Sequence, residues 1–185
     1  MRRMGLILLA ILALAGSSGL LLAANASNAE PSPILSAKAM SRFAVFAHAE
    51  QPGHRLPLPT VPTGLDQASL RLAQQRSGEE AYVVGGPELV CVAARIPGKA
   101  VAIGCSRVTG AATGDEPPMV ALPIEPQGPS KWLVAALVPD GTRQVRIGGL
   151  PSAAISNNTV LMTVDHRPSG IELTTDDGIA HRVGS

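Results

Sequence analysis

The stretch "CVAARIPGKAVAIGC", residues 91 to 105, holds the only two cysteines of the chain and predicts the pairing of two strands. Two runs of Val, Ala and Ile flank the turn residues Pro and Gly, which is the pattern of an antiparallel hairpin. Facing residues of such a hairpin have a constant sum of residue numbers. A three-residue loop at 97–99 pairs Ile96 with Ala100 and therefore places Cys91 opposite Cys105. A two-residue loop would shift the cysteines by one place, and a bulge would then be needed to bring them together.

The N-terminal sequence is typical of an export signal. Arg2 and Arg3 precede the apolar run 6–15, and small residues at 16–19 and 23–29 flank three further leucines. We expect residues 1–29 to be either a signal peptide, cleaved after a small residue, or an uncleaved membrane anchor, because residues 6–24 are long enough to cross a bilayer. On either alternative the rest of the chain is predicted to be extracytoplasmic, either secreted or held at the membrane by its N-terminal segment.

The predicted compartment indicates the state of the two sulfurs. Thiols that lie close together outside the cytoplasm are usually oxidised, so we predict a structural disulfide between Cys91 and Cys105. A metal site would need two further ligands, and the four histidines, His48, His54, His166 and His181, show no ligand spacing. A redox role would need closer Cys-x-x-Cys spacing, and two free thiols are the remaining alternative. We expect no cofactor and no metal.

Composition restricts the class of partner. The chain has 15 basic and 14 acidic residues, and this balance gives no indication of a nucleic acid or an anionic membrane surface as partner. Contact with the membrane is expected only through the N-terminal segment. Aromatic residues make up 2% of the chain, so the core is expected to consist of Val, Leu, Ile and Ala. The 19 glycines and 16 prolines indicate short elements joined by many turns.

Residues 30–64 are predicted to form a helix followed by a Pro-rich connector. Ser36 is a candidate N-cap, and a stripe at helical spacing follows it, formed by Met40, Phe43, Ala44 and Ala47. The stripe is interpreted as a packing surface, with docking onto a partner or the membrane interface as the alternative. Residues 51–64 contain four prolines, which favour extended backbone.

Residues 65–185 are predicted to form one β-rich domain. Asp66 is expected to cap a short helix that ends near Gln75. Nine short runs rich in Val, Ile, Leu and Thr then predict strands, at 81–84, 89–95, 99–106, 120–124, 132–138, 142–147, 159–164, 171–175 and 179–183. Residues 110–118 and 123–130 are expected to be surface loops. The predicted fold is mainly β, an antiparallel sheet or small sandwich preceded by a leader helix and one or two short amphipathic helices.

No motif predicts a catalytic residue. Asp165 and His166 combine a carboxylate with an imidazole, but neighbours on a strand point to opposite faces, so a surface histidine is the favoured interpretation. The sequence 176–178, Asp-Asp-Gly, is interpreted as a hairpin turn in place of a calcium loop. Trp132, the only tryptophan, is expected to fill the core, with an exposed ligand platform as the alternative.

Several stretches resemble a group of uncharacterised exported proteins of high-GC actinobacteria. They are "FAVFAHAEQPGHRLP" at 43–57, "ASLRLAQ" at 68–74, "ELVCVAA" and "AIGCS" around the cysteines, "ALVPDGTRQVRI" at 136–147, "SNNTVLMTV" at 156–164 and "TTDDG" at 174–178. The resemblance implies an exported β-rich domain and no particular activity. The chain departs from the pattern at 47–49, where similar proteins have basic residues.

The function expected from the sequence is that of an envelope-associated, non-catalytic binding or regulatory module with a protein or other envelope component as partner. One alternative is a small envelope hydrolase that assembles Asp165, His166 and a serine from distant positions. Another is a secreted protease inhibitor that presents the disulfide-braced loop from Arg95 to Lys99.

Overall fold

The computed structural model describes residues 37–38, 40–47, 62–98, 100–125, 131–151 and 154–184, all within one compact unit, Pro31–Ser185. The leader at 1–29, the candidate cap Ser36 and the connector at 51–61 lie outside the described residues. The described chain is mainly β and antiparallel, as the sequence predicted.

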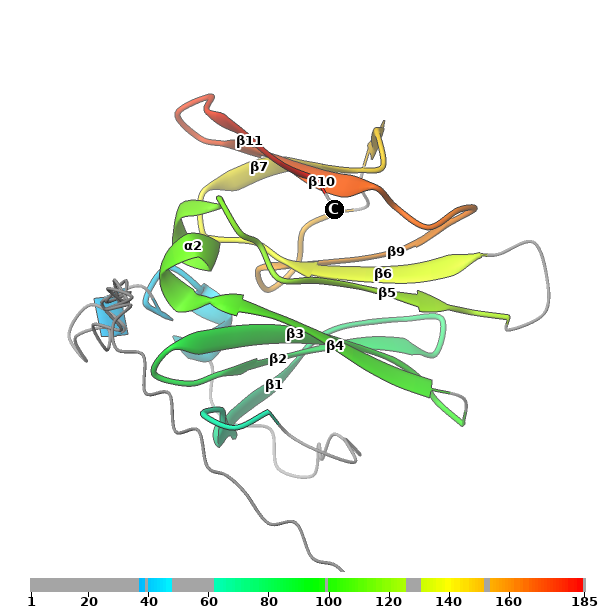
Figure 1. The fold of residues 1–185 in the computed structure, drawn as a ribbon, viewed down its shortest axis with the longest axis horizontal. Helices are drawn as coiled ribbons and strands as arrows, with labels where there is room; N and C mark the ends of the chain where they lie inside the picture. Colours follow the sequence, from blue (N-terminus) through cyan, green and yellow to red (C-terminus); the bar gives the residue numbers. More distant parts are fainter. Residues whose placement is uncertain are drawn as a thin grey trace, which may run out of the picture. The chain divides into compact units, whose positions relative to one another are not determined.

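The described residues form eleven strands in three antiparallel sheets, and Figure 1 shows how these sheets are arranged. The first has the order β1-β2-β3-β4, with β1 at Asp66–Arg76, β2 at Glu79–Gly85, β3 at Leu89–Ile96 and β4 at Ala100–Arg107. The second has the order β5-β6-β9, with β5 at Met119–Pro123, β6 at Trp132–Leu137 and β9 at Thr159–Val164. The third has the order β11-β10-β7-β8, with β7 at Thr142–Ile147, β8 at Leu150–Pro151, β10 at Gly170–Thr175 and β11 at Ala180–Gly184.

The hairpin of β3 and β4 has the register that the sequence predicts for a three-residue loop, and not the one for a two-residue loop. Ile96 faces Ala100, and Cys91 faces Cys105 with their Cα atoms 4.1 Å apart. The two sulfurs form a disulfide. Cys91 is fully buried, whereas Cys105 on the edge strand is exposed. The predicted hairpin and its three-residue loop are therefore confirmed.

The predicted helix from Asp66 to Gln75 is wrong, because these residues form β1. Their backbone pairs with β2 through a register that shifts twice. Ser69 stabilises the irregular part, since its hydroxyl oxygen accepts a hydrogen bond from the backbone N–H of Gly85 at 2.7 Å. Pairing with a neighbouring strand outweighs the weak helical spacing of the segment, as tertiary context often does.

Two short helical segments accompany the sheets: η1, a 3-10 helix at Ala44–Ala47, and α2, an α-helix at Val108–Thr113. The sequence predicts a surface loop at 110–118, but the first residues of this range belong to α2. Its six residues include Gly110 and two threonines, so no strong helical pattern is visible in the sequence. The burial of Val108 and Ala111 holds the turn against the first core cluster.

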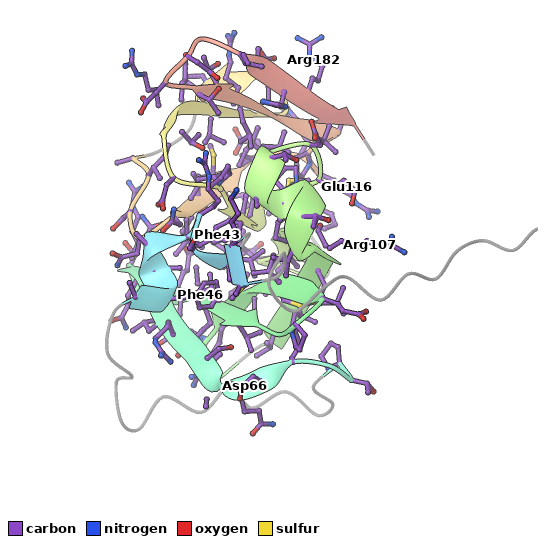
Figure 2. All side chains as sticks on the ribbon, turned by 90° about the vertical axis from the view of Figure 1, so that its left-hand side faces the viewer. Phe43, Phe46, Asp66, Arg107, Glu116 and Arg182 are labelled. Atoms are coloured by element: carbon purple, nitrogen blue, oxygen red, sulfur yellow. A yellow bond between two sulfur atoms is a disulfide. The ribbon has the colours of Figure 1, made fainter. Side chains whose placement is uncertain are left out.

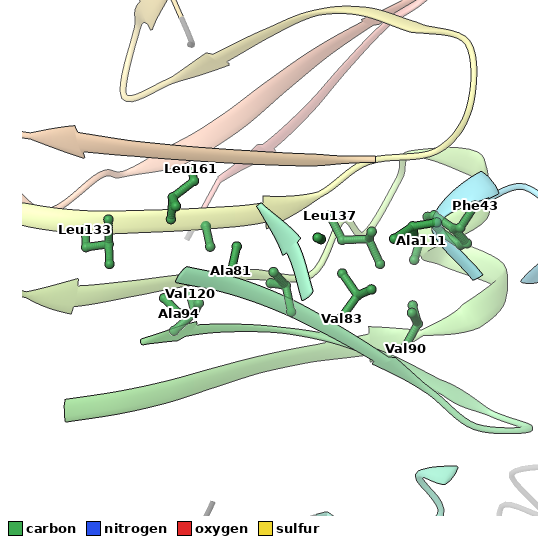
Figure 3. Close-up of a cluster of buried hydrophobic side chains, with 14 of the residues drawn as sticks. Phe43, Ala81, Val83, Val90, Ala94, Ala111, Val120, Leu133, Leu137 and Leu161 are labelled. Atoms are coloured by element: carbon green, nitrogen blue, oxygen red, sulfur yellow. The ribbon is translucent and has the colours of Figure 1, made fainter. Parts of the chain in front are cut away.

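The first core cluster lies between the first and second sheets (Figure 3). Val83 and Val90 of the first sheet meet Leu133, Leu137 and Leu161 of the second. All five side chains are fully buried. The core is thus built largely from branched aliphatic side chains, in agreement with the composition.

The second core cluster lies between the second and third sheets. Alternate residues of β6 point to opposite sides, so Leu133 belongs to the first cluster and Val134 to the second. Val145, Ile147 and Leu173 of the third sheet pack into this second cluster. The second sheet is therefore the middle layer of a three-layer stack, which explains why β6 is apolar at every position.

The predicted helix over the stripe Met40 to Ala47 is interrupted. A turn at Ser41 and Arg42 separates the helical residues before it from η1. Phe43 is buried and Met40 packs against the first core cluster, but Ala44 and Ala47 are exposed. Figure 2 shows Phe43 and Phe46 on this segment, which we call the N-terminal strap, residues 40–47.

Candidate functional site

A surface hollow of about 350 Å³ lies over the end of the third sheet. Residues from three strands and from the connections between them line it: Arg146, Gly148, Gly149, Ser169, Gly170, Ile171, Glu172, Arg182, Val183 and Gly184. On β10, Ile171 and Leu173 face the second core cluster, so Glu172 between them faces the opposite, outer side of the sheet. The hollow therefore lies on a face that no other sheet of the described chain covers.

Three charged side chains form a row across this outer face. Glu172 on β10 is the register partner of Arg146 on β7 and of Arg182 on β11. The guanidinium of Arg182 donates to the Glu172 carboxylate at 2.9 Å. Arg146 has no hydrogen-bond or ion-pair partner within the described residues. Figure 2 shows Arg182 projecting outward from β11.

Glycines form the floor of the hollow beside this row. Gly170 and Gly184 face each other across β10 and β11, two positions from Glu172 and Arg182. At Gly184 the missing side chain leaves the outer face open, so a ligand can approach the backbone there, whereas the backbone of Val183 already fills the space beside Gly170. Gly148 and Gly149 form the tight turn between β7 and β8, with φ values of 59° and 80° that glycine adopts without strain.

A second, smaller hollow of about 50 Å³ adjoins the first and shares Gly148 and Ser169 with it. Its wall includes His166 and Arg167, from the connection between β9 and β10. The guanidinium carbon of Arg167 lies 5.8 Å from the ring centre of Trp132, within the range of a cation–π interaction. We call the two hollows together the arginine groove; its lining carries three arginines and one glutamate.

Trp132 is only partly a core residue. It packs against the second core cluster from the start of β6, and its ring is half-buried beneath Arg167. The expectation that Trp132 fills the core accounts for its contact with the second core cluster, but not for the part of the residue that stays exposed. The position of Arg167 beside the ring was not expected from the sequence.

The structure does not join Asp165 and His166, for which the sequence favoured a surface histidine over a catalytic pair. Both residues are exposed, and His166 makes no hydrogen bond or ion pair within the described part of the chain. His166 does line the smaller hollow with Ser169, but a space of about 50 Å³ is small for a substrate.

A different histidine has a carboxylate partner. Nδ1 of His181 on β11 lies 3.1 Å from Oδ1 of Asp115, which follows α2. Thr113 donates to the same carboxylate at 2.7 Å, and this bond, followed by the His181 contact, lowers the pKa of Asp115. Among the described residues no serine or threonine hydroxyl and no cysteine thiol forms a hydrogen bond with the His181 ring. The pair therefore links two parts of the fold and lacks an adjacent nucleophile.

The loop considered for protease inhibition begins with an engaged arginine. Arg95 forms an ion pair with Glu80 at 3.3 Å, and the hydroxyl of Tyr82 donates to the same carboxylate at 2.9 Å. Lys99 at the other side of the loop lies outside the described residues. The guanidinium of Arg95 is thus directed onto the sheet, whereas a protruding inhibitor loop needs a free side chain.

Within the described ranges no three His, Cys, Asp or Glu side chains come together as a metal site. The same part of the chain contains no helix with both the length and the apolar character of a membrane span.

No family model, curated protein or solved structure matches this chain. The resemblance to exported actinobacterial proteins therefore stays a prediction from the sequence. The arginine groove is the candidate site in which charged side chains meet at a hollow. Sequence reasoning missed it because Arg146, Glu172 and Arg182 lie far apart along the chain and meet only through strand pairing.

Proposed function

We propose that the protein is an extracytoplasmic, non-catalytic binding module that contacts an envelope component through the arginine groove. The observation that carries the proposal is the row Arg146, Glu172 and Arg182 beside a hollow of about 350 Å³. A concave surface with a few convergent polar groups is the usual form of a ligand site. The unpartnered guanidinium of Arg146 supplies a charged group for a ligand at the edge of this hollow.

A binding role fits the chemistry of the groove better than catalysis does. The alternative of a hydrolase built on Asp165, His166 and a serine needs an imidazole oriented by a carboxylate, and His166 has no such partner in the described chain. The oriented imidazole, His181, lies beside Asp115 and away from the groove lining. The described lining residues include arginines that can hold an anionic ligand, but no imidazole that a carboxylate orients.

The proposed location rests on two features. The leader at 1–29 has the pattern of an export signal, which we interpret as a signal peptide or a membrane anchor. The disulfide between Cys91 and Cys105 is the kind of bond that persists outside the cytoplasm. Thiol labelling and protease accessibility of intact cells test this location.

Sedimentation with envelope fragments tests the proposed binding surface. The full chain is expressed with its leader, and the exported protein is mixed with washed cell-envelope fragments of its host. We expect the double variant Arg146→Ala/Arg182→Ala to lose most of the sedimenting fraction. The matched control is Arg76→Ala/Arg107→Ala, which removes two exposed arginines that lie outside the groove and should bind like the parent protein. Equal sedimentation of the two double variants would contradict the proposal.

A further inference from the structure

We infer that the ligand of the arginine groove carries oxyanion groups, either carboxylates or phosphate esters, and that Arg146 is the main group that binds them. The inference rests on the proposed function and specifies the chemistry of the ligand. The first observation is the charge of the residues that line the groove. The whole chain has a net charge of +1, yet the groove lining contains Arg146, Arg167 and Arg182 against the single carboxylate of Glu172. The charged residues of the groove lining therefore carry more positive than negative charge.

The role of each charged residue follows from its partner. Glu172 holds the guanidinium of Arg182 at 2.9 Å, so it fixes the position of that side chain and offsets one positive charge. Arg146, on the other side of Glu172, keeps its full hydrogen-bonding capacity for a ligand. A planar guanidinium with five N–H donors matches the two oxygens of a carboxylate or a phosphate. The groove therefore favours an oxyanion over a neutral or cationic group.

The floor of the groove allows such a group to come close. At Gly184 an added Cβ would have only the carbonyl oxygen of Ser169 near it, at 4.0 Å, so the space above this residue is open. Gly184 is in register with Gly170 and lines the larger hollow. A side chain at position 184 would occupy ligand space without disturbing the packed core. This position offers a test of the site that is independent of charge.

The smaller hollow extends the cationic surface. Arg167 and His166 lie across the shared residues Gly148 and Ser169 from Arg146 and Arg182. Because the two hollows share Gly148 and Ser169, an acidic polymer that extends over both can contact Arg146 and Arg167, whereas a small anion can occupy only one hollow. We therefore expect repeating acidic ligands to bind more tightly than their monomers.

Titration calorimetry at low ionic strength tests the inference with defined probes. Polyphosphate and poly-L-glutamate represent the two sources of oxyanions, inorganic phosphate and acetate are the monomers, and poly-L-lysine is the cationic control. We expect at least one acidic polymer to bind, with a dissociation constant that rises steeply with salt, and poly-L-lysine to show no binding. Binding of polyphosphate alone identifies phosphate as the source, and binding of poly-L-glutamate alone identifies carboxylate.

Variants then locate the binding. Arg146→Ala should weaken polymer binding about tenfold, which corresponds to the loss of one charge-assisted hydrogen-bonded contact. Gly184→Val should weaken it by steric exclusion, while Glu172→Gln should strengthen it because a negative charge is removed. Arg107→Ala, outside the groove, should leave it unchanged. Circular dichroism checks that each variant is folded.

Two results would overturn the inference: no binding of either acidic polymer, or equal weakening by Arg146→Ala and Arg107→Ala. These results are distinct from failure of the proposed function. If the protein still sediments with envelope fragments, and the double variant Arg146→Ala/Arg182→Ala does not, the groove remains the binding surface. Only the proposed oxyanion chemistry is then rejected. If neither assay depends on the groove, both proposals fail.

Discussion

The side-chain oxygen of Asn158 accepts a hydrogen bond from the backbone N–H of Val45 at 2.9 Å, across 113 residues of sequence. Both residues are buried. The amide nitrogen of Asn158 donates to the carbonyl of Val138 at 3.1 Å and to the carboxylate of Asp140 at 2.8 Å. Asp140 in turn accepts a bond from the backbone N–H of Ala44. These bonds fasten the N-terminal strap to the middle sheet beside the buried ring of Phe43.

Replacement of Asn158 should loosen this attachment. Asn158 has a φ of 59°, a conformation that asparagine tolerates better than alanine does. Asn158→Ala leaves the buried N–H of Val45 without its partner and adds backbone strain, so we expect a loss of about 2–4 kcal/mol of unfolding free energy in urea denaturation.

Two further variants separate the causes. Asn158→Gly removes the amide but relieves the strain, and should cost less than Asn158→Ala. Ser156→Ala, on the same turn, removes a hydroxyl that makes no hydrogen bond within the described chain, and should change stability by less than about 0.5 kcal/mol. Equal stability of Asn158→Ala and Ser156→Ala would show that the strap is not held by this amide.

The disulfide should stabilise the fold independently of the strap. It closes a loop between positions 14 residues apart, for which the chain-entropy argument gives about 3 kcal/mol. We expect the double variant Cys91→Ala/Cys105→Ala to unfold at lower urea concentration by about that free energy, and reduction of the parent protein to have a similar effect. Mass spectrometry of the native protein should find no free thiol. Two free thiols, or a reduced protein as stable as the oxidised one, would contradict the assignment.

Structural features that depend on residues close together in the sequence could be predicted, whereas features that depend on distant contacts could not. The strands around Cys91 and Cys105 were predicted with their register because apolar runs end at recognisable turn residues. The segment from Asp66 was predicted as a helix because the spacing of Leu65, Ser69 and Leu72 fits a helix, and only the contact with β2 makes it a strand.

The candidate site depends on contacts between distant segments. In the sequence, an arginine on a short strand looks like any other residue exposed to water. Nothing in the sequence indicates that Arg146 and Arg182 flank the same glutamate. Asp165 and His166 place a carboxylate beside an imidazole in the sequence, but the pair that is in contact in the structure is Asp115 and His181, 66 residues apart. Pairings of this kind arise from the order of strands in the sheets, which a single sequence does not specify.

The approach of β4 to β5 predicts a steric requirement at Gly104. A Cβ at this position would collide with the backbone carbonyl of Met119, where the edges of the first and second sheets meet. Gly104→Ala should therefore destabilise the protein by about 1–3 kcal/mol, because the backbone of one strand must move. Gly184→Ala is the matched control, since its added methyl group has only one atom at 4.0 Å. If thermal denaturation showed the same midpoint for both variants, the close approach of the two sheets would be refuted.

Tyr82, the only tyrosine of the chain, predicts a defined response to alkaline pH. Its hydroxyl donates to Glu80, and Arg95 lies 3.5 Å from the same oxygen. Burial raises the pKa of Tyr82 above the usual value of 10.0; the bond to Glu80 adds to this rise, and Arg95 opposes it. A titration of tyrosinate absorbance reports this one residue, and we expect its midpoint in the folded protein to lie above 10.0.

The raised pKa of Tyr82 also determines the sign of the stability change. The folded protein holds the phenolic proton more tightly than the unfolded chain, so the resulting stabilisation is complete below pH 10.0 and is lost as the pH rises through the folded pKa. Tyr82→Phe should remove this pH dependence and, at neutral pH, cost about 1 kcal/mol because the bond to Glu80 is lost. Glu80→Gln should lower the midpoint of the titration. A midpoint at or below 10.0 in the folded parent protein would mean that the phenol is accessible to water and that the Glu80 contact does not persist in solution.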